Sequence, residues 1–154
     1  MLRQMEQRLP TRGDAALWLW AKTRRDDLVL QCSALKGHVL LTCRVPRERV
    51  LLSHYGDWHS VLNAAPNYRE LPGESAEEAD ARIEALHDDF FARVEAAGVE
   101  PQDLSDWPAD LRAELEATWD SIFDPANYGR AASWQATVHE LRAEDVVEAV
   151  RFDD

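Results

Sequence analysis

The segment around Asp57 holds the side chains best suited to chemistry. If the residues after Asp57 form a helix, His59 and Asn63 lie four positions apart and share one face. His54 stands just before them, so His54, Asp57 and His59 offer three ligands of the kind that bind metal ions, but their spacing matches no recognised metal motif. We favour a structural interpretation, in which Asp57 caps the helix, Trp58 anchors the core and His59 is half-buried and hydrogen-bonded. We therefore predict no metal site.

A second row of polar side chains lies near the C-terminal end of the chain. Alternate residues of a strand point to the same side, so Gln135, Thr137 and His139 share one face. That face either is solvated surface, which is the interpretation we favour, or lines a cleft. In a cleft, His139 would be placed to act as a general base near neutral pH.

The acidic residues point to binding rather than to catalysis. Residues 1–56 carry ten Lys or Arg and five Asp or Glu, whereas residues 57–154 carry seven Arg, no Lys and twenty-four Asp or Glu. Such asymmetry is found in chains with a charged partner, but for the asymmetry itself we favour a fold whose two halves attract each other, with a solvated acidic helix face. The residues expected to contact a basic protein partner are Trp58, Asn63, Glu77, Glu78, Asp88, Asp89, Asp110 and Glu114.

Length and composition limit the classes of protein to consider. The chain has 154 residues, which predicts a single domain over residues 1–154. The net charge of −12 argues against direct binding of nucleic acid. No apolar run reaches the ~18–20 residues of a membrane helix, and the N-terminus has no apolar signal core. Two cysteines, Cys32 and Cys43, make no disulfide framework, so we expect a reduced, cytoplasmic protein without a membrane association.

The pattern of apolar residues predicts strands at both ends of the chain and helices in the middle. A first helix is expected to end before Pro10. The predicted strands cover residues 15–20, 39–45, 50–54, 133–141 and 146–152, and residues 28–32 form either a further short strand or an irregular segment. We therefore predict an α+β fold, with one mixed or antiparallel sheet built from both chain ends and packed against two central acidic helices. Residues 45–51 and 141–147 share a strand–corner–strand pattern, which we interpret as one kind of corner used twice, at adjacent edges of the sheet.

The two central helices carry clear signals for where they begin and end. Ser75 and Glu78 form a capping-box signature, and Gly98 fits the position after the last helical turn. Pro108 suits the start of the next helix, and Asp124-Pro125 suits its end. A shorter helix is expected to follow Asp57.

Four blocks of the chain resemble, in order, segments of a bacterial family catalogued as domain of unknown function 3841. They are Leu17-Trp18-Leu19-Trp20, Val50-Leu51-Leu52-Ser53 with Asp57-Trp58-His59-Ser60-Val61-Leu62-Asn63, Trp119-Asp120-Ser121-Ile122-Phe123-Asp124, and Gln135-Ala136-Thr137-Val138-His139-Glu140-Leu141-Arg142. Members of the family usually carry a further N-terminal segment, so the resemblance implies an N-terminally shorter member. The family also tends to have Trp where this chain has His139.

The resemblance also implies an alternative function. The layout of the family is loosely similar to that of NAD-using ADP-ribosyltransferases, in which a late strand carries a Glu that stabilises the developing ribosyl cation. On this analogy the catalytic candidates are His59, Gln135, His139 and Glu140, in a cleft near His59 and Gln135, with NAD as cofactor. Our leading hypothesis is a non-enzymatic acidic protein without a cofactor that binds or inhibits a basic macromolecular partner, with nucleic-acid mimicry as one form of it. The oligomeric state is left open.

Overall fold

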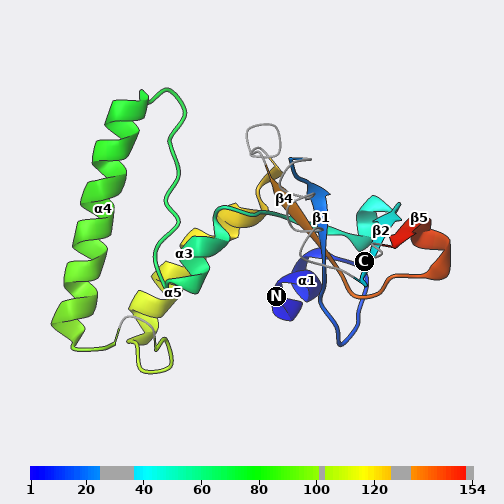
Figure 1. Cartoon of the computed structure of the whole chain (residues 1–154). Coiled ribbons are helices and arrows are strands. Elements are labelled where there is room, and N and C mark those ends of the chain that lie inside the picture. The colour runs from blue at the N-terminus through cyan, green and yellow to red at the C-terminus, as the bar shows by residue number, and fades with distance from the viewer. Residues whose placement is uncertain (25–36, 101–102, 126–132, 152–154) are drawn as a thin grey trace. The chain divides into compact units, whose positions relative to one another are not determined.

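The computed structural model describes residues 1–24, 37–100, 103–125 and 133–151 (Figure 1). The chain divides into two compact units, which we name by their content. The strand unit comprises residues 1–55 and 125–154, and the helical unit comprises residues 56–124. The single domain expected from the chain length stays a prediction. The expected strand at residues 28–32 and Cys32 lie outside the described residues.

The strand unit contains one short helix, five strands and two 3-10 corners among its described residues. In chain order these are α1 (Leu2–Arg8), β1 (Leu17–Lys22), β2 (Val39–Cys43), η1 (Arg47–Arg49), β3 (Leu51–His54), β4 (Trp134–Val138), η4 (Ala143–Asp145) and β5 (Val146–Arg151). The end of α1 before Pro10 agrees with the restriction that proline places on the residue before it. With helices between these strand groups, the α+β class is confirmed.

The strands form two antiparallel sheets rather than the single sheet that we predicted. One sheet has the order β1-β4-β3, with β4 in the middle, and the other pairs β2 with β5. The prediction fails because a 3-10 corner interrupts the chain between β2 and β3 and again between β4 and β5. Each corner therefore carries the chain from one sheet to the other. The packing of a sheet against the two acidic helices stays a prediction.

The two corners, which share a sequence pattern, are joined to each other through Asp145. Both guanidinium Nη atoms of Arg49 donate to the Asp145 carboxylate at 2.8 Å. The Arg142 backbone N–H donates to the same carboxylate at 2.8 Å, and the Arg44 N–H donates to the Asp145 carbonyl at 2.7 Å. Asp145 is only 3% exposed. The corners are thus held together between the two sheets, not placed at adjacent edges of one sheet.

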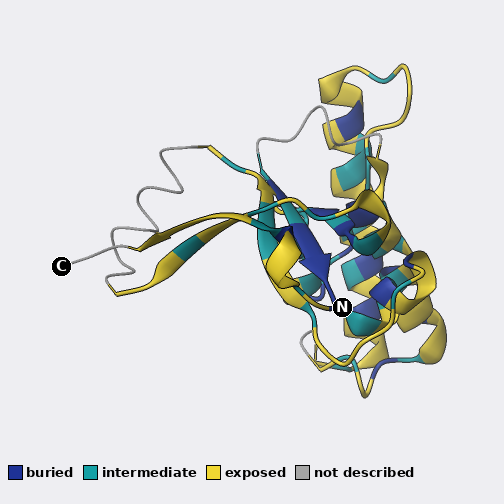
Figure 2. Cartoon of the chain, turned by 90° about the vertical axis from the view of Figure 1, so that its right-hand side faces the viewer, coloured by how far each residue is buried: buried dark blue, intermediate teal, exposed yellow. Residues whose placement is uncertain are grey.

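β4 is buried on both of its faces. On one face, Ala136 lies opposite Leu19 of β1 and Leu52 of β3, within an apolar cluster that includes Val138. On the other face, Thr137 lies opposite Trp18 and Leu51 and is fully buried. The sheet of β2 and β5 is largely exposed instead, as Figure 2 shows.

The helical unit contains α3 (Trp58–Leu62), α4 (Ala76–Ala97), α5 (Ala109–Thr118) and the 3-10 segment η2 (Trp119–Phe123). The predicted capping box at the start of α4 is present, because Ser75 accepts from the Glu78 N–H and Glu78 accepts from the Ser75 N–H. Gly98 ends α4 in the left-handed conformation, with φ of 67°. The apolar core of the unit consists of Ala64, Phe90, Val94, Trp107, Leu111 and Leu115. Within the described ranges, no helix is both long and apolar enough to cross a bilayer.

Candidate functional site

The boundary between the units also divides the charge of the chain. The helical unit carries 18 Asp or Glu and four Arg, whereas the strand unit carries 11 Asp or Glu and 13 Lys or Arg. The helical unit therefore has a net charge of −14, whereas the strand unit has a net charge of +2. A charged surface of this size attracts partners of opposite sign and raises their rate of encounter.

All four arginines of the helical unit are already bound to carboxylates of the same unit. The pairs are Arg69 with Asp57, Arg82 with Glu74, Arg93 with Asp89 and Glu114, and Arg112 with Glu116. The Arg93 guanidinium binds both Glu114 oxygens, at 2.7 and 2.6 Å. Since the unit has no lysine, it has no further Lys or Arg to neutralise its other carboxylates.

Several carboxylates of this unit are held by specific donors. Hydrogen bonds from Arg82 and from the Leu71 backbone lower the pKa of Glu74 to about 2. The backbone and hydroxyl of Ser75 lower the pKa of Glu78, and Arg93 lowers the pKa of Glu114. Glu78 and Glu114, which we expected to bind a partner, are therefore used within the unit, as is Asp89 through Arg93.

A different set of carboxylates forms one line along α4, which we call the acidic stripe. Its members are Glu77, Asp80, Glu84, Asp88 and Glu95. Their spacings of three, four, four and seven residues place them on one face of the helix. All five are exposed, and none has an ion pair or side-chain hydrogen bond within the part of the chain that the structure describes.

Only Glu77 and Asp88 of the acidic stripe were among the predicted contact residues. The helical spacing of Asp80, Glu84 and Glu95 is the signal that would have added them. Beside the stripe, α4 presents a row of exposed alanines: Ala81, Ala85, Ala92 and Ala96. The remaining predicted carboxylate, Asp110, is exposed in the first turn of α5, four residues before Glu114.

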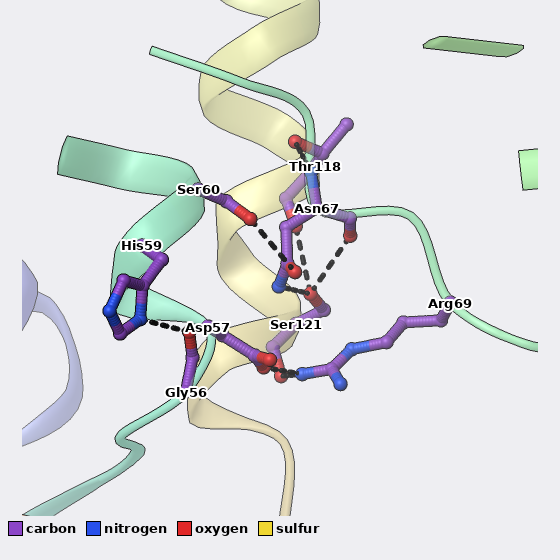
Figure 3. Close-up of polar contacts among 8 residues, drawn as sticks. All are labelled: Gly56, Asp57, His59, Ser60, Asn67, Arg69, Thr118 and Ser121. Carbon is purple, nitrogen blue, oxygen red and sulfur yellow. Dashed lines mark hydrogen bonds and ion pairs between the residues drawn. The ribbon is translucent and has the colours of Figure 1, made fainter. Parts of the chain in front are cut away.

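The segment around Asp57 is built differently from our prediction (Figure 3). Asp57 stands at the start of α3 but makes no side-chain capping bond, because its carboxylate binds Arg69 instead. His59 is exposed rather than half-buried, and its Nδ1 donates to the Gly56 carbonyl at 2.9 Å. Asn63 is also exposed, and its side-chain amide donates to the His59 carbonyl at 2.7 Å. No group of three His, Cys, Asp or Glu suited to a metal ion occurs among the described residues.

Asn67 links this segment to the end of α5 (Figure 3). Its backbone N–H donates to Thr118 Oγ1 at 3.0 Å, and its side-chain amide donates to Ser121 Oγ at 2.8 Å. Arg69 also donates to the Ser121 carbonyl at 3.0 Å. Pattern reasoning missed Asn67 and Arg69, because no local motif reveals partners about fifty residues away.

Two of the blocks that carry the family resemblance meet at this network. They are the second block, through its part from Asp57 to Asn63, and the block that begins at Trp119. Trp58 is half-buried and packs edge-on against Phe123, with ring centroids 6.0 Å apart. The blocks therefore shape the helical unit, which supports the structural interpretation of Trp58.

The polar row on β4 is not solvated surface, so the interpretation we favoured is wrong. Thr137 is fully buried, His139 is 6% exposed and Gln135 is half-buried between Trp20 and Ser53 on the neighbouring strands. Gln135 and Thr137 are covered because β4 is the middle strand of its sheet. His139 follows β4 and is covered by the turn that contains Thr11 and Gly13. His139 Nδ1 forms a hydrogen bond with Thr11 Oγ1 at 2.9 Å.

The other enzyme candidate of the strand unit, Glu140, is exposed. Its carboxylate accepts hydrogen bonds from Arg142 at 2.8 and 2.5 Å. His59 belongs to the helical unit, whereas Gln135, His139 and Glu140 belong to the strand unit. The NAD-using alternative, with its cleft near His59 and Gln135, stays a prediction.

Comparison with known proteins identifies a family. No curated protein and no solved structure matches the chain. One family model matches residues 1–147 of 154, and its description is Domain of unknown function (DUF3841). This match agrees with the resemblance carried by the four sequence blocks. The chain therefore belongs to the DUF3841 family.

Proposed function

We propose that the chain binds a basic protein partner through the acidic stripe of α4. The observation that carries this proposal is that the stripe holds five exposed carboxylates in one line, while every arginine of the helical unit is bound elsewhere in that unit. Lysine and arginine side chains of a partner would supply the missing positive charge. Electrostatic complementarity of this kind mainly raises the association rate and selects the partner.

The stripe is unfavourable for the helix itself. Asp80 and Glu84, and likewise Glu84 and Asp88, are like charges four residues apart. Each such pair destabilises a helix by about 0.2–0.5 kcal/mol. A helix selected for stability alone would carry Lys or Arg at one member of each pair, so that opposite charges lie four residues apart. The arrangement therefore supports a role for the stripe in binding.

The charges of the acidic stripe are spaced more widely than the phosphates of nucleic acid, so the stripe is not a close copy of a nucleic-acid strand. The stripe extends about 27 Å along α4, or about 6–7 Å per charge, at about 1.5 Å per residue. One strand of DNA carries a phosphate every ~3.4 Å along its axis. The acidic stripe thus has about half the linear charge density of one DNA strand. Nucleic-acid mimicry, inhibition of the partner and a cytoplasmic location are finer hypotheses within the proposal.

The exposed alanines beside the stripe support a close approach of the partner. Ala81, Ala85, Ala92 and Ala96 have short side chains that add no bulk to the surface of α4. A partner helix or strand can lie against them while its basic side chains reach the carboxylates. The proposed contact surface is therefore the stripe together with the alanine row.

The test compares two variants that lose the same charge from different places. The stripe variant carries Glu77→Gln, Glu84→Gln and Asp88→Asn. The control variant carries Glu6→Gln, Asp14→Asn and Glu48→Gln, which are exposed positions of the strand unit. Tagged wild type and both variants are used as baits in cell lysate, and retained proteins are quantified by mass spectrometry at stepwise increasing salt.

We expect one basic protein to be retained in stoichiometric amount by wild type and by the control variant, and lost from the stripe variant. It should leave wild type as salt rises toward about 0.5 M, because screening shortens the range of the attraction. Purified partner and chain should then reproduce the same order of affinities. Equal loss from both variants would show that net charge alone attracts the proteins, and retention by the stripe variant would place the contact elsewhere; either result overturns the proposal.

A further inference from the structure

The strand unit contains a small cavity where the turn after α1 lies against the residues that follow β4. Thr11, Arg12, Arg49, His139 and Glu140 line it. These residues come from three separate stretches of the chain. The cavity lies wholly within the strand unit, so it is independent of the acidic stripe.

His139 gives the cavity a buried polar group that lacks a partner. The ring is 6% exposed and its Nδ1 is held by Thr11 Oγ1. The other ring nitrogen, Nε2, is buried and has no hydrogen-bond partner among the described residues. Buried polar atoms of proteins nearly always have a partner, so an unsatisfied one calls for a water molecule, an ion or a ligand.

The charges around the cavity select the kind of ligand. Arg49 is neutralised by Asp145, and the Glu140 carboxylate is held by Arg142. Arg12 differs, because its Nη1 donates only to the backbone carbonyls of Leu9 and Thr11, at 2.8 and 2.9 Å. The carbonyls fix the guanidinium but carry no charge, and Arg12 has no carboxylate partner in the described ranges. The cavity is therefore left with one uncompensated positive charge.

Gly13 keeps the turn close to the imidazole. A Cβ atom at position 13 would lie 2.8 Å from the Cβ of His139 and 3.2 Å from its Cγ. Such a distance is too short for two carbon atoms that are not bonded. The backbone at Gly13 therefore packs closely against His139, and Arg12 and His139 line the same cavity.

We infer that this cavity binds a small oxyanion of the phosphate type, with Arg12 and His139 as its two principal donors. The guanidinium has further N–H groups that can donate to oxygen. In the tautomer in which Thr11 Oγ1 donates to Nδ1, the His139 ring carries a proton on Nε2 that it can donate. Arginine recognises phosphate oxygens with charge-assisted hydrogen bonds. Inorganic phosphate and the phosphate group of a nucleotide share this chemistry, and the test below separates the two sources.

The test measures phosphate binding to the whole chain and to two charge-matched variants. Arg12→Gln removes the proposed donor at an exposed position, so the fold should persist. The control variant Arg8→Gln removes the same charge from an exposed position of α1. The Arg8 guanidinium donates to the Gln4 side chain. Binding of inorganic phosphate, AMP and NAD is followed by calorimetry at constant ionic strength, and the ring nitrogens of His139 are followed by ¹⁵N NMR.

We expect wild type and Arg8→Gln to bind phosphate with the same affinity. Arg12→Gln should bind phosphate at least about tenfold more weakly. The Nε2 resonance of His139 should move on addition of phosphate in wild type. Tighter binding of AMP or NAD than of inorganic phosphate would identify a nucleotide as the source of the phosphate group. Absence of binding by all three compounds, equal weakening in both variants, or an unmoved Nε2 resonance would each overturn the inference.

Discussion

In the strand unit, the Asp145 carboxylate is 3% exposed and receives three hydrogen bonds from Arg49 and Arg142, whereas in the helical unit the five carboxylates of the acidic stripe are exposed. The strand unit uses its buried ion pair to hold two chain corners together. The helical unit pairs all its arginines with carboxylates of its own, and among the described residues the carboxylates of the acidic stripe have no ion pair. Ionised groups thus serve the architecture in one unit and, as we propose, recognition in the other.

The first prediction asks how far the two units depend on each other. Phe90 is fully buried in the core of the helical unit and packs against Trp107. Phe90→Ala should cost about 3–5 kcal/mol of unfolding free energy, because it removes a ring and leaves a cavity. Each unit has an apolar cluster of its own. In Phe90→Ala we therefore expect the amide NMR signals of α4, the helical signals, to be lost at a lower denaturant concentration than those of β4.

A smaller loss is expected for the control variant Leu86→Ala, because Leu86 is partly exposed on the same helix. If the β4 amide signals of Phe90→Ala disappear in the same step as the helical signals, the units unfold together. That outcome would support the single domain predicted from chain length and would weaken the contrast between the units.

The second prediction compares a buried ion pair with an exposed one inside the strand unit. Asp145→Asn removes the charge that holds Arg49, while Glu140→Gln removes the exposed partner of Arg142. Removing one member of a buried pair leaves the other charge without compensation, whereas exposed pairs contribute little. Thermal unfolding followed by tryptophan fluorescence should show a large fall in Tm for Asp145→Asn and almost none for Glu140→Gln. Equal effects would contradict the architectural role of Asp145.

The third prediction concerns acid pH. The pKa of Glu74 is lowered to about 2 by Arg82 and the Leu71 backbone, from 4.5 as the ordinary value. A carboxylate with a lowered pKa in the folded state stabilises the fold above its unfolded pKa, and this stabilisation is lost as pH falls through the folded pKa. Tm should therefore fall between pH about 4.5 and about 2. Glu74→Gln should have a lower Tm at neutral pH and a smaller fall in this range, and an unchanged acid profile would exclude Glu74 as its cause.

The smallest predicted effect has the opposite sign. Glu84 lies four residues from both Asp80 and Asp88 on the acidic stripe. Glu84→Gln removes two like-charge pairs and should stabilise the helical unit by about 0.4–1 kcal/mol at low salt. Urea unfolding at low and high salt checks this, because screening should abolish the gain. Destabilisation by Glu84→Gln would show that the stripe supports the fold, and the proposed binding role would lose that support.

Reasoning from the sequence succeeded where neighbouring residues decide the structure. The capping box of Ser75 and Glu78, the end of α4 at Gly98 and the end of α1 before Pro10 all involve residues within a few positions of one another. It failed where a distant residue competes. Asp57 has the right type and position for a helix cap, but Arg69, twelve residues later, binds its carboxylate.

The sequence by itself determined the ends of the long helix, the membership of the DUF3841 family and the concentration of acidic residues after position 56. The tertiary structure alone decided which of those acidic residues are neutralised, because Glu114 is paired with Arg93 on another helix. It also decided that His139 is buried rather than solvated, since its burial depends on the distant turn at Thr11 and Gly13 that folds against it. Propensities and caps act over a few residues, whereas ion pairing and burial are set by parts of the chain that meet only after folding.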